Sequence, residues 1–325
     1  MTEELRYNHA VNRALTDAMA ADPTVILFGE DVADAGGVYG ATRGLRDRFG
    51  PARVLDTPIS EAAIVGMAVG AAISGLRPIV EISFIDFMTF AMDAVVNQAA
   101  KMRTMFGGQC SIPMVLRTQH GGGAGSGPQH SQCLEAWFAH VPGLKVVCPA
   151  DPASAYGLLR AAIDDPDPVI VVEHKALYAT RVPMPDALPV LPLGRAAVLR
   201  PGRDLTIVAY GAALRAVSEA AGILAAEGVE AEILDLRSLQ PWDEAAVLAS
   251  LARTHRLLIV HEAVEAFGIG AEIAARMADI GFDELDAPIL RVGAPFMPSP
   301  VAKALEQRYM PNATSIIAAA RRLVA

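Results

Sequence analysis

Glu61 stands at the head of an almost wholly apolar segment, which makes it a candidate for acid–base chemistry in this sequence of 325 residues. The preceding Thr57 and Pro58 predict a helix N-cap followed by proline at the first helical position, so that Glu61 lies in the first turns. Two interpretations are open here. The acid can stabilise the helix dipole by about 0.3–1 kcal/mol, or it can be a buried working acid, because apolar surroundings favour its protonated form.

The helix after Glu61 is predicted to be buried on nearly every face, and one of its faces is almost bare of side chains. Ala62, Gly66, Gly70 and Ser74 recur at four-residue spacing, which places them on one side of a helix. Another backbone can therefore approach closely. Packing within the same domain and contact across a subunit interface explain this face equally well.

The glycine-rich stretch Gln119–Gln132 follows a predicted strand and offers His120 and His130. It does not match a phosphate-binding loop, because no Gly-Lys-Ser/Thr follows the glycines. Histidine is the side chain that exchanges protons most readily near neutral pH. A histidine on such a loop is often only a surface residue, but His130, just before a predicted helix, is the better candidate for proton transfer.

Two further stretches allow a chemical and a packing interpretation. Phe84, Phe87 and Phe90 lie at helical spacing after a predicted strand, so they are either core residues or a wall on which a flat heterocycle stacks. The segment 267–277, FGIGAEIAARM, imitates a dinucleotide fingerprint, although packing of a helix on a sheet explains its glycines as well. The sequence contains no Gly-x-Ser-x-Gly and no His-Glu-x-x-His, so neither a serine hydrolase nor a zinc protease is indicated.

The elements that must position these residues alternate between short β-rich runs and longer Ala-rich helical patterns, as in parallel α/β proteins. Four prolines after Lys175 interrupt this rhythm and predict a segment without regular structure. We therefore expect two parallel-sheet α/β domains, at residues 1–180 and 196–325, joined by a linker at 181–195. Loops beyond the carboxyl ends of the strands are where ligands are expected.

Composition excludes several classes of function. A hydrophobic content of 53% and a net charge of -9 fit a globular protein that does not bind nucleic acid and has a cationic protein partner. The three cysteines are odd in number and outside Cys-x-x-Cys spacing, which predicts reduced thiols and a cytoplasmic protein. We expect no signal peptide, and no membrane span, because the longest apolar run ends after 15 residues, at 62–76.

Five motifs, in this order and spacing, closely resemble the beta subunit of thiamine-diphosphate-dependent 2-oxoacid dehydrogenases, a family that includes the pyruvate, branched-chain and acetoin dehydrogenases. They are FGEDVADAGGVYGATRGLRDRFG, DTPISEAAIVGMAVGAA, GPQHSQCLEAWFAHVPGLKVVCPADPASAYGLL, DLRSLQPWDEAAV and FGIGAEIAARM. The resemblance runs essentially from end to end. It implies an oxidoreductase with a transketolase-like pyrimidine-binding domain followed by a transketolase C-terminal domain.

The resemblance also implies roles for individual residues. In the family, the residue that matches Glu61 forms a hydrogen bond with the aminopyrimidine ring of thiamine diphosphate. This bond promotes loss of the thiazolium proton. His130 matches a histidine that assists acyl transfer to a lipoyl group. The remaining cofactor-binding positions match Glu30, Ile59, Ser83 and Phe87. The family varies at the positions of Ser83 and Phe90, so the resemblance does not imply a particular substrate preference.

Some members of this family bind a structural potassium ion, and the resemblance extends to those positions. They match Met114, Ala162, Ile163, Asp165 and Asp167. Backbone carbonyls and hard carboxylates suit such a cation. A turn in the sequence AIDDPDP that binds no cation explains these residues as well.

One family feature is absent, since no Gly-Asp-Gly motif for magnesium and the diphosphate occurs in the sequence. The resemblance then implies an alpha subunit that holds magnesium, a heterotetramer of two alpha and two beta chains, and a lipoyl acyltransferase core as further partner. Two alternatives are a half-subunit of a split transketolase and a non-catalytic scaffold subunit. Which 2-oxoacid is used, or whether acetoin is, depends on the partner chain.

Overall fold

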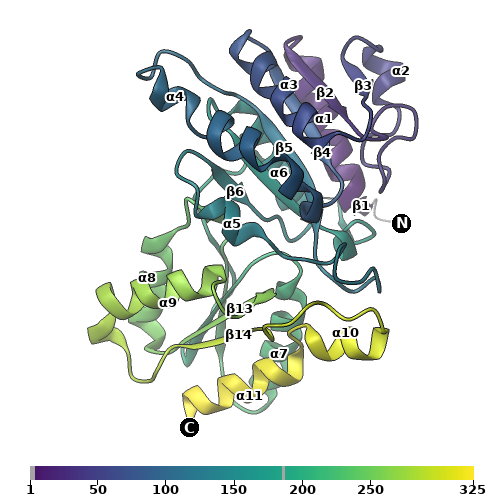
Figure 1. Cartoon of the computed structure of the whole chain (residues 1–325). Coiled ribbons are helices and arrows are strands. Elements are labelled where there is room, and N and C mark those ends of the chain that lie inside the picture. The colour runs from purple at the N-terminus through teal and green to yellow at the C-terminus, as the bar shows by residue number, and fades with distance from the viewer. Residues whose placement is uncertain (1–3, 185–186) are drawn as a thin grey trace. The chain divides into compact units, whose positions relative to one another are not determined.

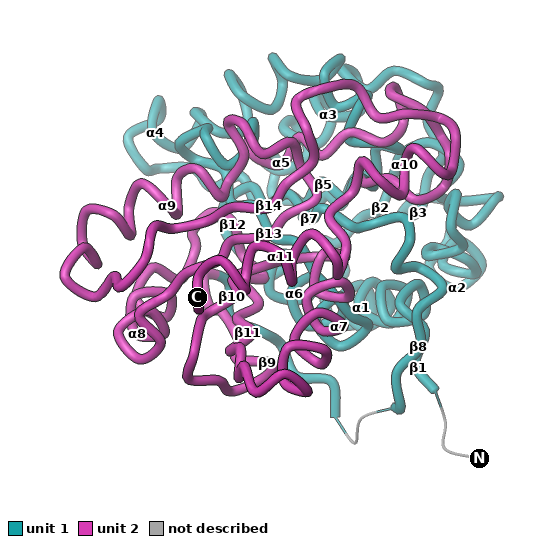
Figure 2. The backbone as a smooth tube through the Cα atoms, turned by 90° about the horizontal axis from the view of Figure 1, so that it is seen from below, with its two compact units in different colours: residues 1–120, 137–193 teal, residues 121–136, 194–325 magenta. Residues whose placement is uncertain are grey.

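The computed structural model describes residues 4–184 and 187–325, and these residues form two compact units (Figure 1). The first unit comprises residues 1–120 and 137–193, and the second comprises residues 121–136 and 194–325 (Figure 2). The glycine-rich stretch after the strand that ends at His120 therefore belongs to the second unit. The predicted α/β class is confirmed, since both units contain mainly parallel sheets with helices between the strands.

The first unit begins with the short strand β1 and the long helix α1. Its strands are β1 (Glu4–Arg6), β2 (Val25–Gly29), β3 (Val54–Asp56), β4 (Arg77–Ile82), β5 (Val115–His120), β6 (Lys145–Val147), β7 (Val169–His174) and β8 (Arg181–Pro183). Its helices and turns are α1 (Tyr7–Ala21), α2 (Leu45–Phe49), α3 (Glu61–Ile73), η1 (Ile85–Ala91), η2 (Ala94–Ala99), α4 (Met102–Met105), α6 (Pro152–Asp164) and η3 (Lys175–Leu177), and α5 (Glu135–Ala139) lies across the boundary at residue 137.

The main sheet of this unit is parallel, in the order β6-β7-β5-β4-β2-β3. Every residue of β5 and β7 is buried, as expected for central strands covered on both faces. Helix α6 starts with a capping box, in which the Asp151 carboxylate accepts from the Ser154 N–H and Pro152 occupies the first turn. Helices α1 and α6 pack against each other, and α3 packs on η1 and η2.

The second unit repeats the α/β alternation with its own sheet, in the order β14-β13-β10-β11-β9. All pairs are parallel except β11 with β9, which lies at the edge. Its strands are β9 (Ala197–Arg200), β10 (Leu205–Ala209), β11 (Ala231–Asp235), β12 (Ser238–Gln240), β13 (Leu257–Val264) and β14 (Leu290–Ala294). Its helices are α7 (Ala213–Ala226), α8 (Glu244–Thr254), α9 (Ile269–Ile280), η4 (Phe282–Glu284), α10 (Lys303–Tyr309) and α11 (Ala313–Val324).

The proline-rich segment after His174 departs from the expectation of no regular structure. It contains the 3₁₀ turn η3 and the short strand β8, whose residues pair antiparallel with β1. The extended backbone that proline favours also suits a short edge strand, which explains why a count of prolines missed it. Residues 185 and 186 of the proposed linker lie outside the described residues.

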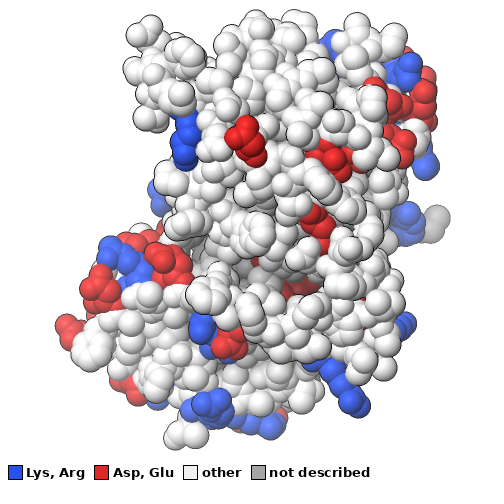
Figure 3. Space-filling view, in the orientation of Figure 1, with Lys and Arg blue, Asp and Glu red and all other residues white. Residues whose placement is uncertain are grey.

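Charged residues of both signs lie together on part of the surface (Figure 3). Figure 3 shows this around α8 and α9, where Arg276 forms ion pairs with Glu244 and Asp279. Within residues 4–184 and 187–325, no helix combines the length and the apolar character needed to cross a membrane.

Candidate active site

Three strands of the first unit bring the predicted cofactor-binding residues to one edge of the sheet. In the parallel register, Gly29 of β2 lies opposite Asp56 of β3 and Glu81 of β4. Glu30 follows β2 directly, and Ser83 follows β4 directly. These side chains therefore gather at the carboxyl edge of a parallel sheet, where ligands bind in such folds.

Helix α3 begins at Glu61 and not earlier, so the predicted N-cap at Thr57 is wrong. The backbone N–H of Thr57 donates to the Gly29 carbonyl at 2.9 Å, which extends the pairing of β3 with β2 by one residue. Ser60 is the N-cap instead, and its side chain makes no capping hydrogen bond. The delay places the Glu61 carboxylate at the first helical residue, directly beside the sheet edge.

The edge carries polar atoms that are buried and have no hydrogen-bond partner. They are Oε1 of Glu30, Oγ1 of Thr57 and Oγ of Ser83. Leaving such a group unsatisfied costs about 1–3 kcal/mol. Three of them at one edge indicate a place prepared for a polar ligand rather than a packing defect.

The electrostatics of the two carboxylates support the same interpretation. Burial raises the pKa of Glu30. The Glu61 carboxylate raises it further, and Asp31 has a smaller effect in the same direction. A carboxyl group whose pKa is raised by burial and by a neighbouring acid is frequent at catalytic and cofactor-binding sites.

Apolar side chains follow strands β3 and β4, and several are exposed in this chain. Ile59 is 81% exposed, just before α3. The Phe87 ring is half-buried and stacks on Phe90 with a centroid distance of 6.5 Å and an interplanar angle of 20°. Phe90 is 67% exposed. The core interpretation of these two rings is therefore wrong, and stacking of a flat heterocycle on them stays a prediction.

A buried ion network that sequence reasoning missed lies behind this edge. Arg117 of β5 is fully buried, and its Nε and Nη2 donate to Glu173 of β7 at 2.8 Å each, while its Nη1 donates to Glu81 of β4 at 2.6 Å. Gln119 donates to the other Glu81 oxygen at 3.0 Å, and the Tyr178 hydroxyl donates to Glu173. The network ties β4, β5 and β7 together two residues before Ser83.

Helix α3 is not buried on every face, contrary to expectation. Ile64, Val65 and Val69 are buried, but the small-residue face is exposed, and Met67 beside it is 49% exposed. A Cβ atom built at Gly66 or Gly70 meets nothing within 4 Å. Close packing within this unit, one of the two interpretations of this face, is therefore excluded.

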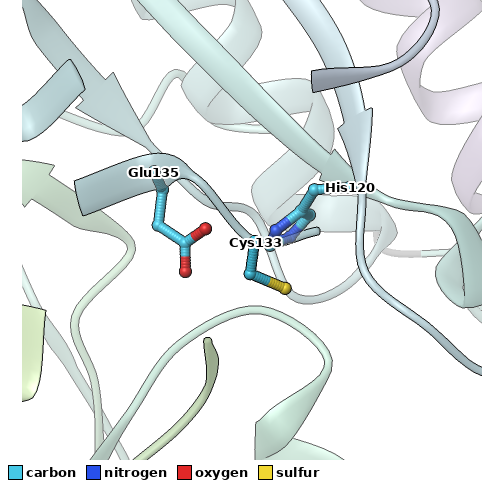
Figure 4. Close-up of side chains that lie close together, drawn as sticks. All are labelled: His120, Cys133 and Glu135. Carbon is cyan, nitrogen blue, oxygen red and sulfur yellow. The ribbon is translucent and has the colours of Figure 1, made fainter. Parts of the chain in front are cut away.

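The loop that carries His130 is anchored within the second unit. The Gly122 N–H donates to Glu262 at 2.6 Å, and the Gly125 N–H donates to Glu306 of α10 at 3.0 Å. Beyond His130, Glu135 at the start of α5 accepts from the Tyr210 hydroxyl at 2.8 Å. Figure 4 shows Cys133 and Glu135 on this segment. Glu262 and Glu306 come from distant parts of the sequence, so no local pattern could have found them.

The segment 267–277 uses its glycines for packing rather than for a dinucleotide. A Cβ atom at Gly268 would lie 2.7 Å from Cε1 of His261, and one at Gly270 would lie 2.8 Å from its Nε2. Burial lowers the pKa of His261, so this histidine is neutral inside the unit. The glycines make room for its ring.

The five residues matched to a potassium site gather at one corner of the first unit. The Ile163 carbonyl accepts from Arg77 at 2.8 Å, and the Met114 carbonyl accepts from the Val169 N–H at 3.0 Å. Lys145 donates to both oxygens of Asp165 at 2.7 Å. An ammonium group thus lies where a monovalent cation was expected, and potassium binding stays a prediction.

Comparisons with known proteins agree with both units. Residues 3–181 match the family model described as transketolase, pyrimidine binding domain, and residues 194–316 match transketolase, C-terminal domain. The chain is 45% identical to the pyruvate dehydrogenase E1 component subunit beta-2, mitochondrial, of Oryza sativa subsp. japonica, over 98% of this chain and 86% of that protein. It is also 45% identical to the acetoin:2,6-dichlorophenolindophenol oxidoreductase subunit beta of Bacillus subtilis (strain 168), over 100% of this chain and 98% of that protein.

A solved structure titled split gene transketolase, inactive beta4 tetramer, has the same fold. It superposes with a TM-score of 0.81 and 23% sequence identity, and the match covers 98% of each chain. The relatives at 42–46% identity are named as pyruvate dehydrogenase and acetoin oxidoreductase beta subunits. These names favour a dehydrogenase beta subunit over the alternative of a split transketolase.

Proposed function

Because the chain belongs to the transketolase-like family of pyruvate and acetoin dehydrogenase beta subunits, we propose that it is the beta subunit of a thiamine-diphosphate-dependent 2-oxoacid or acetoin dehydrogenase. The observation that carries the proposal is the sheet edge of the first unit, where Glu61 and Glu30 lie near buried polar atoms that lack partners. The reaction is decarboxylation of a 2-oxoacid, or cleavage of acetoin, followed by acyl transfer to lipoamide.

The residues at this edge fit the pyrimidine end of the cofactor. When bound, thiamine diphosphate supplies the nucleophilic carbon that attacks the oxo group of the substrate. Glu61 would hold a proton between its carboxyl group and a ring nitrogen. Glu30 and Ser83 supply hydrogen-bonding atoms that have no partner in this chain. Ile59 and Phe87 would pack on the ring and exclude water from it.

The partner chain is the second part of the proposal. Since the sequence lacks the Gly-Asp-Gly motif, an alpha subunit holds magnesium and the diphosphate, in a heterotetramer of two alpha and two beta chains. The open, exposed face of α3 at Gly66 and Gly70 supports this partnership, because it leaves room for another backbone. The net charge of -9 supports docking of a cationic domain of an acyltransferase core. We propose a cytoplasmic location, supported by three cysteines that form no disulfide bond with one another.

The direct test of catalysis is Glu61→Ala in the assembled complex. The assay follows the reaction that the wild type performs, which is decarboxylation of pyruvate, decarboxylation of a branched 2-oxoacid or cleavage of acetoin. We expect its rate to fall by at least about 100-fold, the lower end of the range for loss of acid–base assistance. Glu219→Ala on the exposed surface of α7 is the matched control and leaves the rate unchanged. Normal turnover by Glu61→Ala would instead favour the scaffold alternative.

His130 is proposed to assist the second half-reaction. His130→Ala is expected to lower acylation of lipoamide more than decarboxylation measured with an artificial electron acceptor. His140→Ala, an exposed histidine of the same sequence region, serves as the control. Equal losses in the two assays would remove His130 from acyl transfer.

A further inference from the structure

A cavity of about 510 Å³ lies entirely within the second unit, between the His130 loop and the ends of two strands. It is lined by residues that follow β14, by the end of β13 and by the segment 128–134. Its volume falls in the range of small-molecule sites, roughly 300–1,000 Å³. It also lies beyond the carboxyl ends of parallel strands, which is the usual ligand position in α/β units.

The lining is mainly apolar, but it contains two buried hydroxyl groups without partners. Ser131 is 5% exposed and Ser299 is 7% exposed, and the Oγ atom of each is buried with no hydrogen-bond partner. Their neighbours in the lining include Leu134, Val264 and Met297. An apolar ligand body with one or two polar groups would satisfy both hydroxyls while burying these side chains.

The charges of the lining exclude anions. Glu262 is a carboxylate in the lining, and none of the described residues that line the cavity is a lysine or an arginine. Burial raises the pKa of Tyr309 to about 12, with Cys133 and Glu262 adding to the effect, so this phenol stays a neutral hydrogen-bond donor at physiological pH. A carboxylate or phosphate ligand would meet repulsion with no compensating cation.

We propose that this cavity is a second ligand site, which takes a small uncharged molecule with an apolar body and a carboxamide or alcohol group. All its lining residues belong to the second unit, whereas Glu61 belongs to the first. The inference rests on the geometry of the second unit alone, so it stands or falls independently of the proposed function.

The test uses the full chain with neutral and anionic probes of the same ring. Binding of benzamide, benzyl alcohol and benzoate is measured by saturation-transfer NMR. The site is located by the rate at which iodoacetamide modifies Cys133, a half-buried thiol of the lining. Cys110, half-buried in the first unit, is the internal control thiol.

We expect the two neutral probes to bind saturably and to slow modification of Cys133 but not of Cys110, while benzoate does neither. Ser131→Ala and Ser299→Ala are each expected to weaken benzamide binding about fivefold, the loss of one neutral hydrogen bond. Ser218→Ala, on α7 outside the cavity, leaves it unchanged. Absence of binding by both neutral probes, equal binding of benzoate, or unchanged affinity in the double serine variant would each overturn the proposal.

Discussion

Glu30 and Glu61 lie close enough at the sheet edge of the first unit for the second to raise the pKa of the first, and we expect this to affect stability. A carboxyl group whose pKa is raised on folding binds its proton more tightly in the folded state. The wild type therefore loses stability as the pH rises from the ordinary carboxyl value, about 4.3, through the raised pKa of Glu30. At neutral pH the burial and the repulsion by Glu61 are fully unfavourable.

Glu30→Gln removes this unfavourable contribution. We expect the variant to unfold at a higher temperature than the wild type at pH 7, and the gain to shrink as the pH falls below the ordinary carboxyl range. The measurement is the thermal midpoint across that pH range, with Glu219→Gln as an exposed control. A gain that is the same at acidic and neutral pH would show that charge repulsion is not its cause.

At the scale of elements, the Arg117 network holds the strands that present the site. Burial alone would lower the pKa of Arg117, but Glu173 and Glu81 raise it well above the ordinary value, so the guanidinium stays charged. Arg117→Met leaves two buried carboxylates uncompensated, and breaking such a buried pair costs about 3–5 kcal/mol.

We expect Arg117→Met to lower the free energy of unfolding by this amount in urea titrations. Arg276→Met is the control, because Arg276 makes its ion pairs at the surface and its loss should change little. An Arg117→Met chain as stable as the control variant would show that the network does not hold these strands together.

Continuous apolar runs between helical patterns have few other uses in a protein of this size. They predicted the strands β2, β4, β5, β6, β7, β10, β11, β13 and β14. Long-range contacts could not be predicted. Nothing near Gly122 in the sequence indicates that Glu262 and Glu306 anchor its loop, and nothing near Ser83 indicates Arg117. Exposure of α3 was also missed, because an apolar sequence cannot distinguish burial in its own chain from burial under a partner.

At the scale of the whole molecule, substitutions on the exposed face of α3 should affect binding of the partner chain without affecting folding of this chain. Gly66→Leu and Gly70→Leu place side chains in open space, so the chain alone should fold with an unchanged or slightly higher thermal midpoint, since leucine has the better helix propensity. Co-purification with the alpha subunit should be lost, because the added side chains block the approach of its backbone.

Gly222→Leu on α7 is the matched control, since a Cβ atom there also meets nothing within 4 Å. It should likewise leave the midpoint unchanged or slightly higher, and it should leave co-purification unchanged. If the two α3 variants assembled as well as the control, α3 would not be the contact with the alpha subunit.

We propose that this chain holds one half of a cofactor site and that a partner chain holds the other half. Calorimetric titration of thiamine diphosphate with magnesium into the chain alone, the alpha subunit alone and their complex tests it most directly. We predict tight binding only for the complex, and its loss when the beta chain carries Glu61→Ala. Tight binding by the isolated beta chain would contradict the account.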